Sequence, residues 1–143
     1  MPRWISFAET TEAVREQVKT VTRRDGWTFL ESGTYLKPAV KCMGLDKGES
    51  VEPIFDDGTI IQVTDVWREK LNHIASLDEK CPTCQTTYNM ECIREGFPEI
   101  TGRQFAEYFM DAMGVGWDDL VTRIEFEYVG PDEHEFDPDE ILP

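Results

Sequence analysis

The stretch Gln17-Val18-Lys19-Thr20-Val21-Thr22-Arg23-Arg24-Asp25-Gly26-Trp27 sets a lysine, a threonine hydroxyl and two arginines within six residues. The chain around it is strongly acidic, with 14 Lys and Arg side chains against 29 Asp and Glu among 143 residues. A local cluster of positive charge on such a background needs a cause. We expect that cause to be an anionic or very polar ligand.

The residues before and after Lys19 predict a change from helix to strand at this cluster. Thr10 or Thr11 can cap a helix, and Val14 and Val18 lie four residues apart on one face of it. We expect this helix to end near Lys19, because the β-branched run 20–22 favours extended backbone. Backbone N–H groups and side chains can converge on a ligand at such a junction.

The remainder of the chain predicts an α+β domain over residues 1–129. Alternating or β-branched segments indicate strands, at 3–8, 34–42, 59–71 and 121–129. Pro38 is expected to interrupt its strand or displace it to a sheet edge.

A second helix is predicted over 101–113, with Phe105, Phe109 and Met113 in the core. We expect a loop or loose hairpin over 44–58, and an irregular, cysteine-containing insertion within 72–100. The expected architecture is a small mixed β-barrel or curled sheet with two flanking helices.

Charge and composition restrict the functions to be considered. The formal net charge is −15, of which six charges lie in the acidic C-terminal tail 130–143. The remaining −9 argues against extended phosphate-backbone binding, which needs many Lys and Arg contacts. No apolar run is long enough to span a membrane and no signal peptide is visible, so a cytoplasmic location is expected. A small ligand, a short RNA feature or a basic protein partner is compatible with this composition.

The cluster resembles the signature of the ASCH domains, which belong to the PUA-like β-barrel superfamily. That signature reads Gly-x-Lys-x-x-Glu-x-Arg: Lys19 and Arg24 match it, Gln17 replaces the glycine and Thr22 replaces the glutamate. The threonine is similar to the motif Lys-Thr-x-Thr-x-Arg of small bacterial ASCH proteins that hydrolyse N4-acetylcytidine. The chain also resembles phage-encoded ASCH-like proteins with a KTVTRR core and an EGFP segment, here residues 95–98.

This resemblance implies a PUA-like fold and a catalytic set of Lys19, Thr22 and Glu95. In that chemistry Thr22 is the nucleophile, Lys19 the base and Glu95 an acid and base for amide hydrolysis. Burial or the neighbouring arginines would lower the pKa of Lys19 enough for this role. No organic cofactor is expected.

Further ligand contacts are expected from cationic and aromatic side chains near the cluster. Arg23 or Arg24 can hold an oxyanion, and Trp27 or Trp4 can stack on a base. Three other functions stay open. The site can bind RNA or a modified base without catalysis, the acidic surface can serve a phage or regulatory interaction protein, or the cations can merely stabilise a helix end and surface ion pairs.

A second constellation predicts a structural zinc site within the insertion 73–92. His73, Cys81, Cys84 and Cys92 follow the spacing His-x7-Cys-x2-Cys-x7-Cys, and a two-residue separation lets both thiolates reach one zinc ion. Cys42 or Asp78 are alternatives to His73. A redox-active CxxC pair and simply unligated thiols are the competing interpretations.

Overall fold

The computed structural model describes residues 2–41 and 50–133, and within them a mainly antiparallel sheet is the central element. Its strands lie in the order β1-β3-β5-β8-β2, and β4 pairs with β3 outside this path. Only β1 and β3 run parallel. The bounds are β1 Arg3–Ser6, β2 Val21–Arg24, β3 Tyr35–Lys41, β4 Glu52–Pro53, β5 Ile60–Lys70 and β8 Leu120–Val129.

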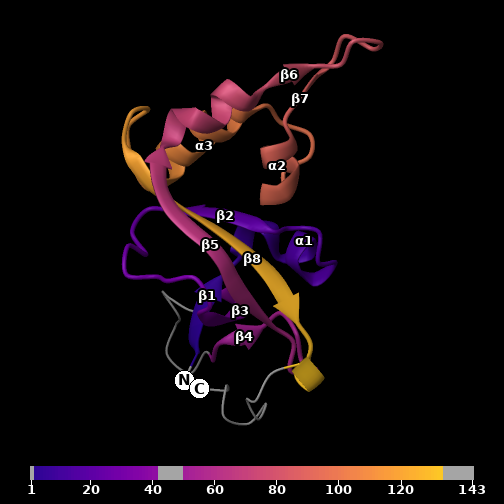
Figure 1. Ribbon diagram of the computed structural model, residues 1–143, viewed down its shortest axis with the longest axis vertical. Coiled ribbons are helices and arrows are strands. Elements are labelled where there is room, and N and C mark those ends of the chain that lie inside the picture. The colour runs from indigo at the N-terminus through magenta and orange to yellow at the C-terminus, as the bar shows by residue number, and fades with distance from the viewer. Residues whose placement is uncertain (1, 42–49, 134–143) are drawn as a thin grey trace.

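The helices and a small hairpin complete the described fold (Figure 1). The α-helices are α1 Thr11–Arg15, α2 Met90–Glu95 and α3 Gly102–Met113. Short 3-10 helices are η1 Ala8–Thr10, η2 Leu71–Leu77 and η3 Pro131–Glu133, and the hairpin consists of β6 Glu79–Lys80 and β7 Thr87–Tyr88. The predicted α+β class is confirmed. A closed barrel is not, because β1 and β2 are the two ends of the strand path and do not pair with each other in the described residues.

In the described residues, the two larger of three buried hydrophobic clusters lie along the long strands β5 and β8, whose course Figure 1 shows; these two clusters are called the two cores. The first fills the curled sheet and contains Ile5, Phe7, Val14, Leu36, Ile61, Val63, Ile124 and Phe126, among others. The second joins η2, α2 and α3 to one end of these strands, through Leu71, Ile74, Cys92, Phe105, Ala106, Phe109 and Val121. β5 and β8 pair from Ile60↔Val129 to Lys70↔Leu120, with a shift of register between Val63 and Asp65, so the same two strands run through both cores.

The start of α3 shows how closely the second core is packed. Thr101 caps α3 through a capping box with Gln104. A Cβ on Gly102 would lie 2.2 Å from the carbonyl oxygen of Ile74, so only glycine lets α3 approach η2 this closely. The helix is thereby fixed against the segment that precedes the hairpin.

Several sequence-based expectations require correction. The first helix ends at Arg15 rather than near Lys19. β3 is not an edge strand: it lies between β1 and β5, and Pro38 is tolerated because the pairing with β5 covers only Tyr35 and Leu36. The stretch 72–100 is largely regular, since it holds η2, the hairpin and α2. Met113 is 51% exposed and so lies outside the core. Part of the predicted loop 44–58, and the tail from 134 on, lie outside the described residues.

Candidate active site

The loop between α1 and β2 brings Lys19 against Glu95, the last residue of α2. The ammonium Nζ of Lys19 lies 3.2 Å from Glu95 Oε1 and also donates to the main-chain carbonyl of Glu95. Both residues are only 2% exposed. A hydrogen bond of 2.8 Å from the Thr20 N–H to the Arg94 carbonyl ties the same two segments together. The structure therefore joins two residues 76 positions apart in the sequence into one buried ion pair.

Arg23 continues this ion pair into a buried network on β2. Its guanidinium contacts three carboxylates, with Nη1 at 2.8 Å from Glu95 Oε2 and Nη2 at 3.0 Å from Glu69 and 2.9 Å from Glu91. The Arg23 side chain is fully buried. Burial alone would lower its pKa, but the charges of Glu95, Glu91 and Glu69 raise the pKa above its ordinary value. Arg23 is thus charged and committed to contacts within the protein.

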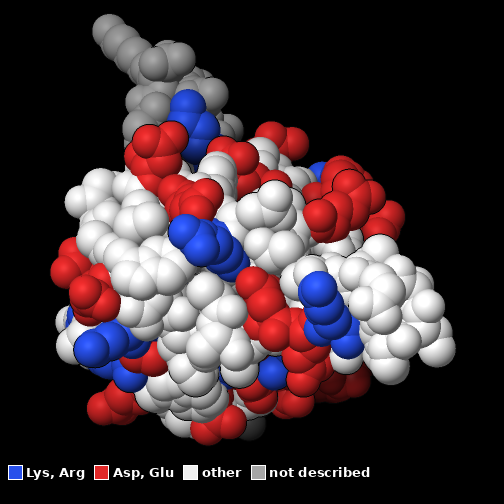
Figure 2. All heavy atoms as spheres, turned by 90° about the horizontal axis from the view of Figure 1, so that it is seen from above, with Lys and Arg blue, Asp and Glu red and all other residues white. Residues whose placement is uncertain are grey.

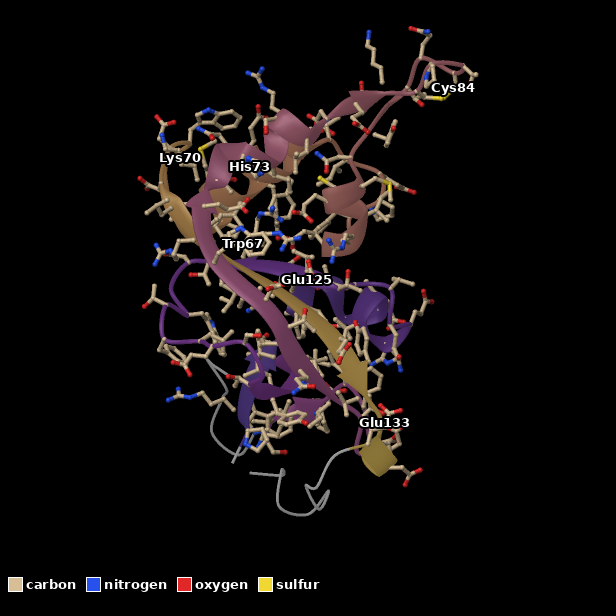
Figure 3. The ribbon with its side chains drawn as sticks, viewed as in Figure 1. Trp67, Lys70, His73, Cys84, Glu125 and Glu133 are labelled. Atoms are coloured by element: carbon tan, nitrogen blue, oxygen red, sulfur yellow. The ribbon has the colours of Figure 1, made fainter. Side chains whose placement is uncertain are left out.

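Arg123, directly opposite Arg23 in the β2–β8 ladder, forms the outer part of the network. Two like charges in this position repel each other. Glu91 relieves the repulsion, because its Oε2 accepts from Arg23 and also, at 2.8 Å, from Nε of Arg123. Arg123 further contacts Glu125, which pairs with Arg94 at 2.8 Å, and its guanidinium lies 4.4 Å from the ring centroid of Trp67 (Figure 3). Four cations and four carboxylates therefore balance one another between β2, β5, β8 and α2.

Thr22 lies next to this network with its hydroxyl held by Arg24. Arg24 Nε donates to Thr22 Oγ1 at 3.2 Å, and its Nη2 donates to the carbonyl of Ser6 at 2.5 Å. The second bond links β2 to β1, the two ends of the sheet. Since the Thr22 hydroxyl accepts from Arg24, its own proton is available for another acceptor. Thr22 is 4% exposed and so is shielded from bulk water.

A cavity of about 280 Å³ lies between the two cores and is lined by the predicted catalytic residues. Lys19, Thr22 and Glu95 all line it, as do Arg23 and Arg24. Half of its other lining residues are aromatic, namely Phe7, Phe97, Phe105, Tyr108 and Phe109. The cavity thus combines a cluster of polar groups on one wall with apolar rings on the others, which is the usual composition of a small-molecule site.

Burial changes the acid–base properties of Lys19. Removal from water lowers its pKa below the ordinary value of 10.5, and Arg24 and Arg23 lower it further, while the charge of Glu95 opposes the shift. The net direction is downward. A lysine with a lowered pKa loses its proton more readily and is better suited to act as a base.

Trp4 and Trp27 line a second, adjacent cavity instead of the first. This cavity is about 570 Å³ in volume and shares Ser6 and Arg24 with the first. Trp27 stacks on Phe29 with ring centroids 5.5 Å apart, and the Trp4 indole N–H is buried without a partner in the described part of the chain. The two tryptophans are therefore near the predicted catalytic set but separated from it by Arg24.

The predicted zinc ligands are not brought together. Cys81 and Cys84 lie at the tip of the β6–β7 hairpin, whereas Cys92 is fully buried in the second core, where burial raises its pKa to about 12. His73 lies in η2, far from the hairpin tip (Figure 3). Asp78, the alternative ligand, accepts from the Gly102 N–H at 2.6 Å. Over residues 2–41 and 50–133, no group of three or more His, Cys, Asp or Glu side chains is arranged to hold a metal.

The two hairpin cysteines form a unit of their own. Both are free thiols at least partly accessible to solvent. Hydrogen bonds from Cys84 and Thr83 lower the pKa of Cys81 to about 6. This pair is the part of the predicted constellation that the structure retains.

The sequence pattern did not indicate the outer members of the network, which are Glu69, Glu91, Glu125, Arg94 and Arg123. One signal was available: Glu91 and Glu95 lie four residues apart and so share one face of a helix. The alternation along β8 placed Arg123 and Glu125 on a common face but did not indicate that α2 covers it.

Comparisons with known proteins give information on the fold of the chain. No family model and no curated protein matches the chain. Among solved structures, the chain is similar to ASCH from Zymomonas mobilis, with 16% identity and a TM-score of 0.50 over 87% of this chain and 65% of that one. It is also similar to an Enterococcus faecalis V583 protein of the DUF984 family model, with 15% identity and a TM-score of 0.54 over 96% of this chain and 86% of that one.

The chain has an ASCH-domain fold. This confirms the fold that the cluster at residues 19–24 implied. The chain spans less than two thirds of the length of the Zymomonas protein. Among the described residues, none of the helices is long and apolar enough to cross a membrane.

Proposed function

We propose that the cavity between the two cores binds a modified pyrimidine nucleoside and hydrolyses an N-acyl amide on its base. The observation that carries this proposal is the convergence of Lys19, Thr22 and Glu95 on one cavity. Amide hydrolysis needs a nucleophile, a base for its proton and a donor for the departing amine, all close to one carbonyl carbon. A buried hydroxyl and a lysine with a lowered pKa, which both line this cavity, offer the first two.

The size and walls of the cavity favour a nucleoside over a folded RNA. Its volume of about 280 Å³ lies near the lower end of the range for small-molecule pockets, about 300–1,000 Å³. Aromatic walls suit a planar base. Figure 2 shows acidic and basic side chains interspersed on the end of the molecule that carries α3, without a continuous basic stripe on that face to track a phosphate backbone.

The proposed reaction uses the Thr22 hydroxyl, which accepts from Arg24, and Lys19, which lines the same cavity. The neutral Lys19 amine takes the proton of the Thr22 hydroxyl, whose oxygen attacks the acyl carbon, and Arg24 stabilises the developing negative charge. The C–N bond then breaks as the Lys19 ammonium returns the proton to the leaving amine. Water hydrolyses the resulting threonine ester, so the sum is amide plus water giving amine plus carboxylic acid.

Glu95 fits a positioning role in this scheme. Both of its carboxylate oxygens accept from cations, Oε1 from Lys19 and Oε2 from Arg23. Both oxygens are thus already engaged by cations of the protein, which suits a residue that holds its neighbours in place. Glu95 therefore orients Lys19 and helps it carry the transferred proton.

A second candidate, a module that binds a modified base without catalysis, is favoured by one observation. Lys19 already donates to the Glu95 carboxylate and to a main-chain carbonyl. If those bonds keep it charged in the liganded protein, it cannot accept the Thr22 proton. The cavity would then hold its ligand with no bond broken.

Turnover with N4-acetylcytidine separates the two candidates. Purified chain is incubated with the nucleoside and released cytidine is measured by liquid chromatography. The enzyme proposal expects turnover that rises with pH as Lys19 loses its proton, and it expects Thr22→Ala to reduce the rate at least about 100-fold, since nucleophile and base act together. Thr22→Ser, which keeps a hydroxyl, should retain measurable turnover.

Lys19→Arg separates the ion-pair role of Lys19 from its role as a base, because an arginine can keep the ion pair with Glu95 but does not deprotonate near neutral pH. We expect it to fold, to bind the nucleoside and to release no cytidine. Full activity of this variant, or of Thr22→Ala, would contradict the mechanism. Saturable binding without product in the unmodified chain would instead support the binding module.

A further inference from the structure

The β6–β7 hairpin has a backbone conformation at Cys81-Pro82-Thr83-Cys84-Gln85 that suits a metal. The Cys84 N–H donates to Cys81 Sγ at 3.3 Å, and the Gln85 N–H donates to the Cys81 carbonyl at 3.0 Å. Gln85 has φ 63°, a left-handed conformation that turns the chain back after the second cysteine. A bond from Cys81 N–H to the Thr86 carbonyl at 2.8 Å closes the loop. N–H groups directed at sulfur stabilise thiolate charge and orient thiolate ligands.

Hydroxyl groups complete the surroundings of the two sulfurs. Cys84 Sγ lies 2.9 Å from Thr86 Oγ1, and Cys81 Sγ lies 3.3 Å from Thr83 Oγ1. Hydroxyls in these positions can donate to thiolates. Two cysteines separated by two residues are the usual half of a tetrahedral zinc site with sulfur ligands.

The rest of the described chain cannot supply the other half. It contains no cluster of three or more His, Cys, Asp or Glu side chains placed to hold a metal. The hairpin projects beyond the body of the molecule, and its tip, marked by Cys84, lies far from His73 (Figures 1 and 3). A tip in this position can approach the tip of another molecule without contact between their bodies.

Charge distribution also favours contact through this tip. Two copies of a chain with a formal net charge of −15 repel each other. Residues 81–90, however, contain no Asp, Glu, Lys, Arg or His. In Figure 2 the outermost lobe on the right, the side to which the hairpin projects in Figure 1, is uncharged, and red and blue side chains flank it.

We propose that Cys81 and Cys84 form half of a tetrahedral thiolate site for Zn²⁺, and that the same two cysteines of a second copy complete it. Zinc then joins two copies tip to tip. Each of the four thiols loses its proton on binding, so the assembly weakens as the pH falls. The site is independent of the cavity at Lys19.

The test uses the full chain, reduced and freed of metal with a chelator, and then supplied with ZnCl₂. We expect the mass from light scattering to double from 16.5 kDa, with one zinc per two chains retained after gel filtration. Co²⁺ in place of Zn²⁺ should give the intense sulfur-to-cobalt absorption of a four-thiolate site. Cys81→Ser and Cys84→Ser should each abolish the dimer and the bound metal, whereas Cys92→Ser should leave both unchanged.

Three outcomes would overturn the proposal. The first is a monomer that retains one zinc per chain, in particular if Cys42→Ser releases it, because the site would then lie within one copy. The second is zinc-dependent association that persists in Cys84→Ser, which would show non-specific aggregation. The third is the absence of retained zinc in the reduced chain.

Discussion

Gln17 adopts φ 60°, a left-handed conformation that costs most side chains free energy. It follows the last turn of α1, where the Val18 N–H bonds to the Ala13 carbonyl and the Gln17 N–H to the Val14 carbonyl. These two bonds form a Schellman motif, whose left-handed position is normally glycine. The motif turns the chain after α1, and Lys19, two residues further on, is buried.

Replacing Gln17 with glycine should therefore stabilise the protein. We expect Gln17→Gly to raise the free energy of unfolding by about 0.5–1 kcal/mol, because relief of the left-handed strain exceeds the added entropy of the unfolded chain. Glu16→Gly is the matched control: Glu16 has φ −83°, so the change there should be destabilising. Urea unfolding measures both, and a loss of stability in Gln17→Gly would contradict this account of the turn.

Arg23 should contribute strongly to stability because its three carboxylate partners are all held close to it. Arg23→Met leaves Glu95, Glu91 and Glu69 with one cation fewer, and removal of one partner from a buried ion pair typically costs about 3–5 kcal/mol. Arg103→Met is the control, since the pair of Arg103 with Glu107 is exposed and such pairs contribute about 0–1 kcal/mol. A similar, small effect of both substitutions on urea unfolding would show that the network is not a structural element.

The sequence was most informative at the residue scale. Residues 19–24 predicted the fold and brought Lys19, Thr22 and Glu95 together as candidates, and all three line one cavity. Arg123 was not identified, because alternation along a strand shows which side chains share a face but not what covers that face. Arg123 is only 4% exposed because α2 lies over it.

At the scale of elements, α2 lies over the polar face of β2 and β8 and supplies carboxylates that pair with the cations there. Glu91 and Glu95 point from one helix face into a set of cations, while Cys92 and the rest of the second core hold the opposite side. Six residues are too few to show helical periodicity, so the sequence did not predict α2. Its position depends on tertiary ion pairs, which a local pattern cannot reveal.

This role of Glu91 predicts a specific pH dependence of stability. Burial alone would raise the pKa of Glu91, but the hydrogen bonds from Arg123 and the charge of Arg23 lower it to about 2 from an ordinary 4.5. A lowered pKa in the folded state gives stabilisation that is fully present above pH 4.5 and is lost as the pH falls towards 2. We expect the stability difference between the unmodified chain and Glu91→Gln to be largest near pH 6 and to shrink steadily below pH 4.5.

Urea unfolding at several pH values between 6 and 2.5 measures this difference. Glu107→Gln, at an exposed position on α3, is the control and should show no comparable change. A gap between Glu91→Gln and the unmodified chain that stays constant over this range would mean that Glu91 does not hold α2 through its charge.

The hairpin shows what cysteine spacing can and cannot predict. The separation of Cys81 and Cys84 indicated a pair of ligands on a turn, and the structure forms that turn. The wider spacing to Cys92 and His73 carried no information about distance, because Cys92 is drawn into an apolar core and His73 belongs to η2. Within the described residues, Cys92 and His73 therefore do not extend the Cys81–Cys84 pair to a four-ligand site.

At the scale of the whole molecule, the candidate active site exists because the protein has two cores. The cavity takes Phe7 from the first core and Phe105 and Phe109 from the second, and β5 and β8 fix the distance between the cores (Figure 1). The predicted barrel or curled sheet with two flanking helices already placed Phe105 and Phe109 in the core. It did not show that they belong to a second core, which faces the polar residues across the cavity.

The central claim is that a modified nucleoside binds in this cavity, and chemical-shift mapping tests it most directly. The Thr22→Ala chain, labelled with ¹⁵N, is titrated with N4-acetylcytidine so that binding is observed without turnover. We expect saturable shifts in the amides of residues 19–24, 95–97 and 105–109, which surround the cavity. An absence of shifts, or shifts confined to residues around Trp4 and Trp27 in the adjacent cavity, would contradict the claim.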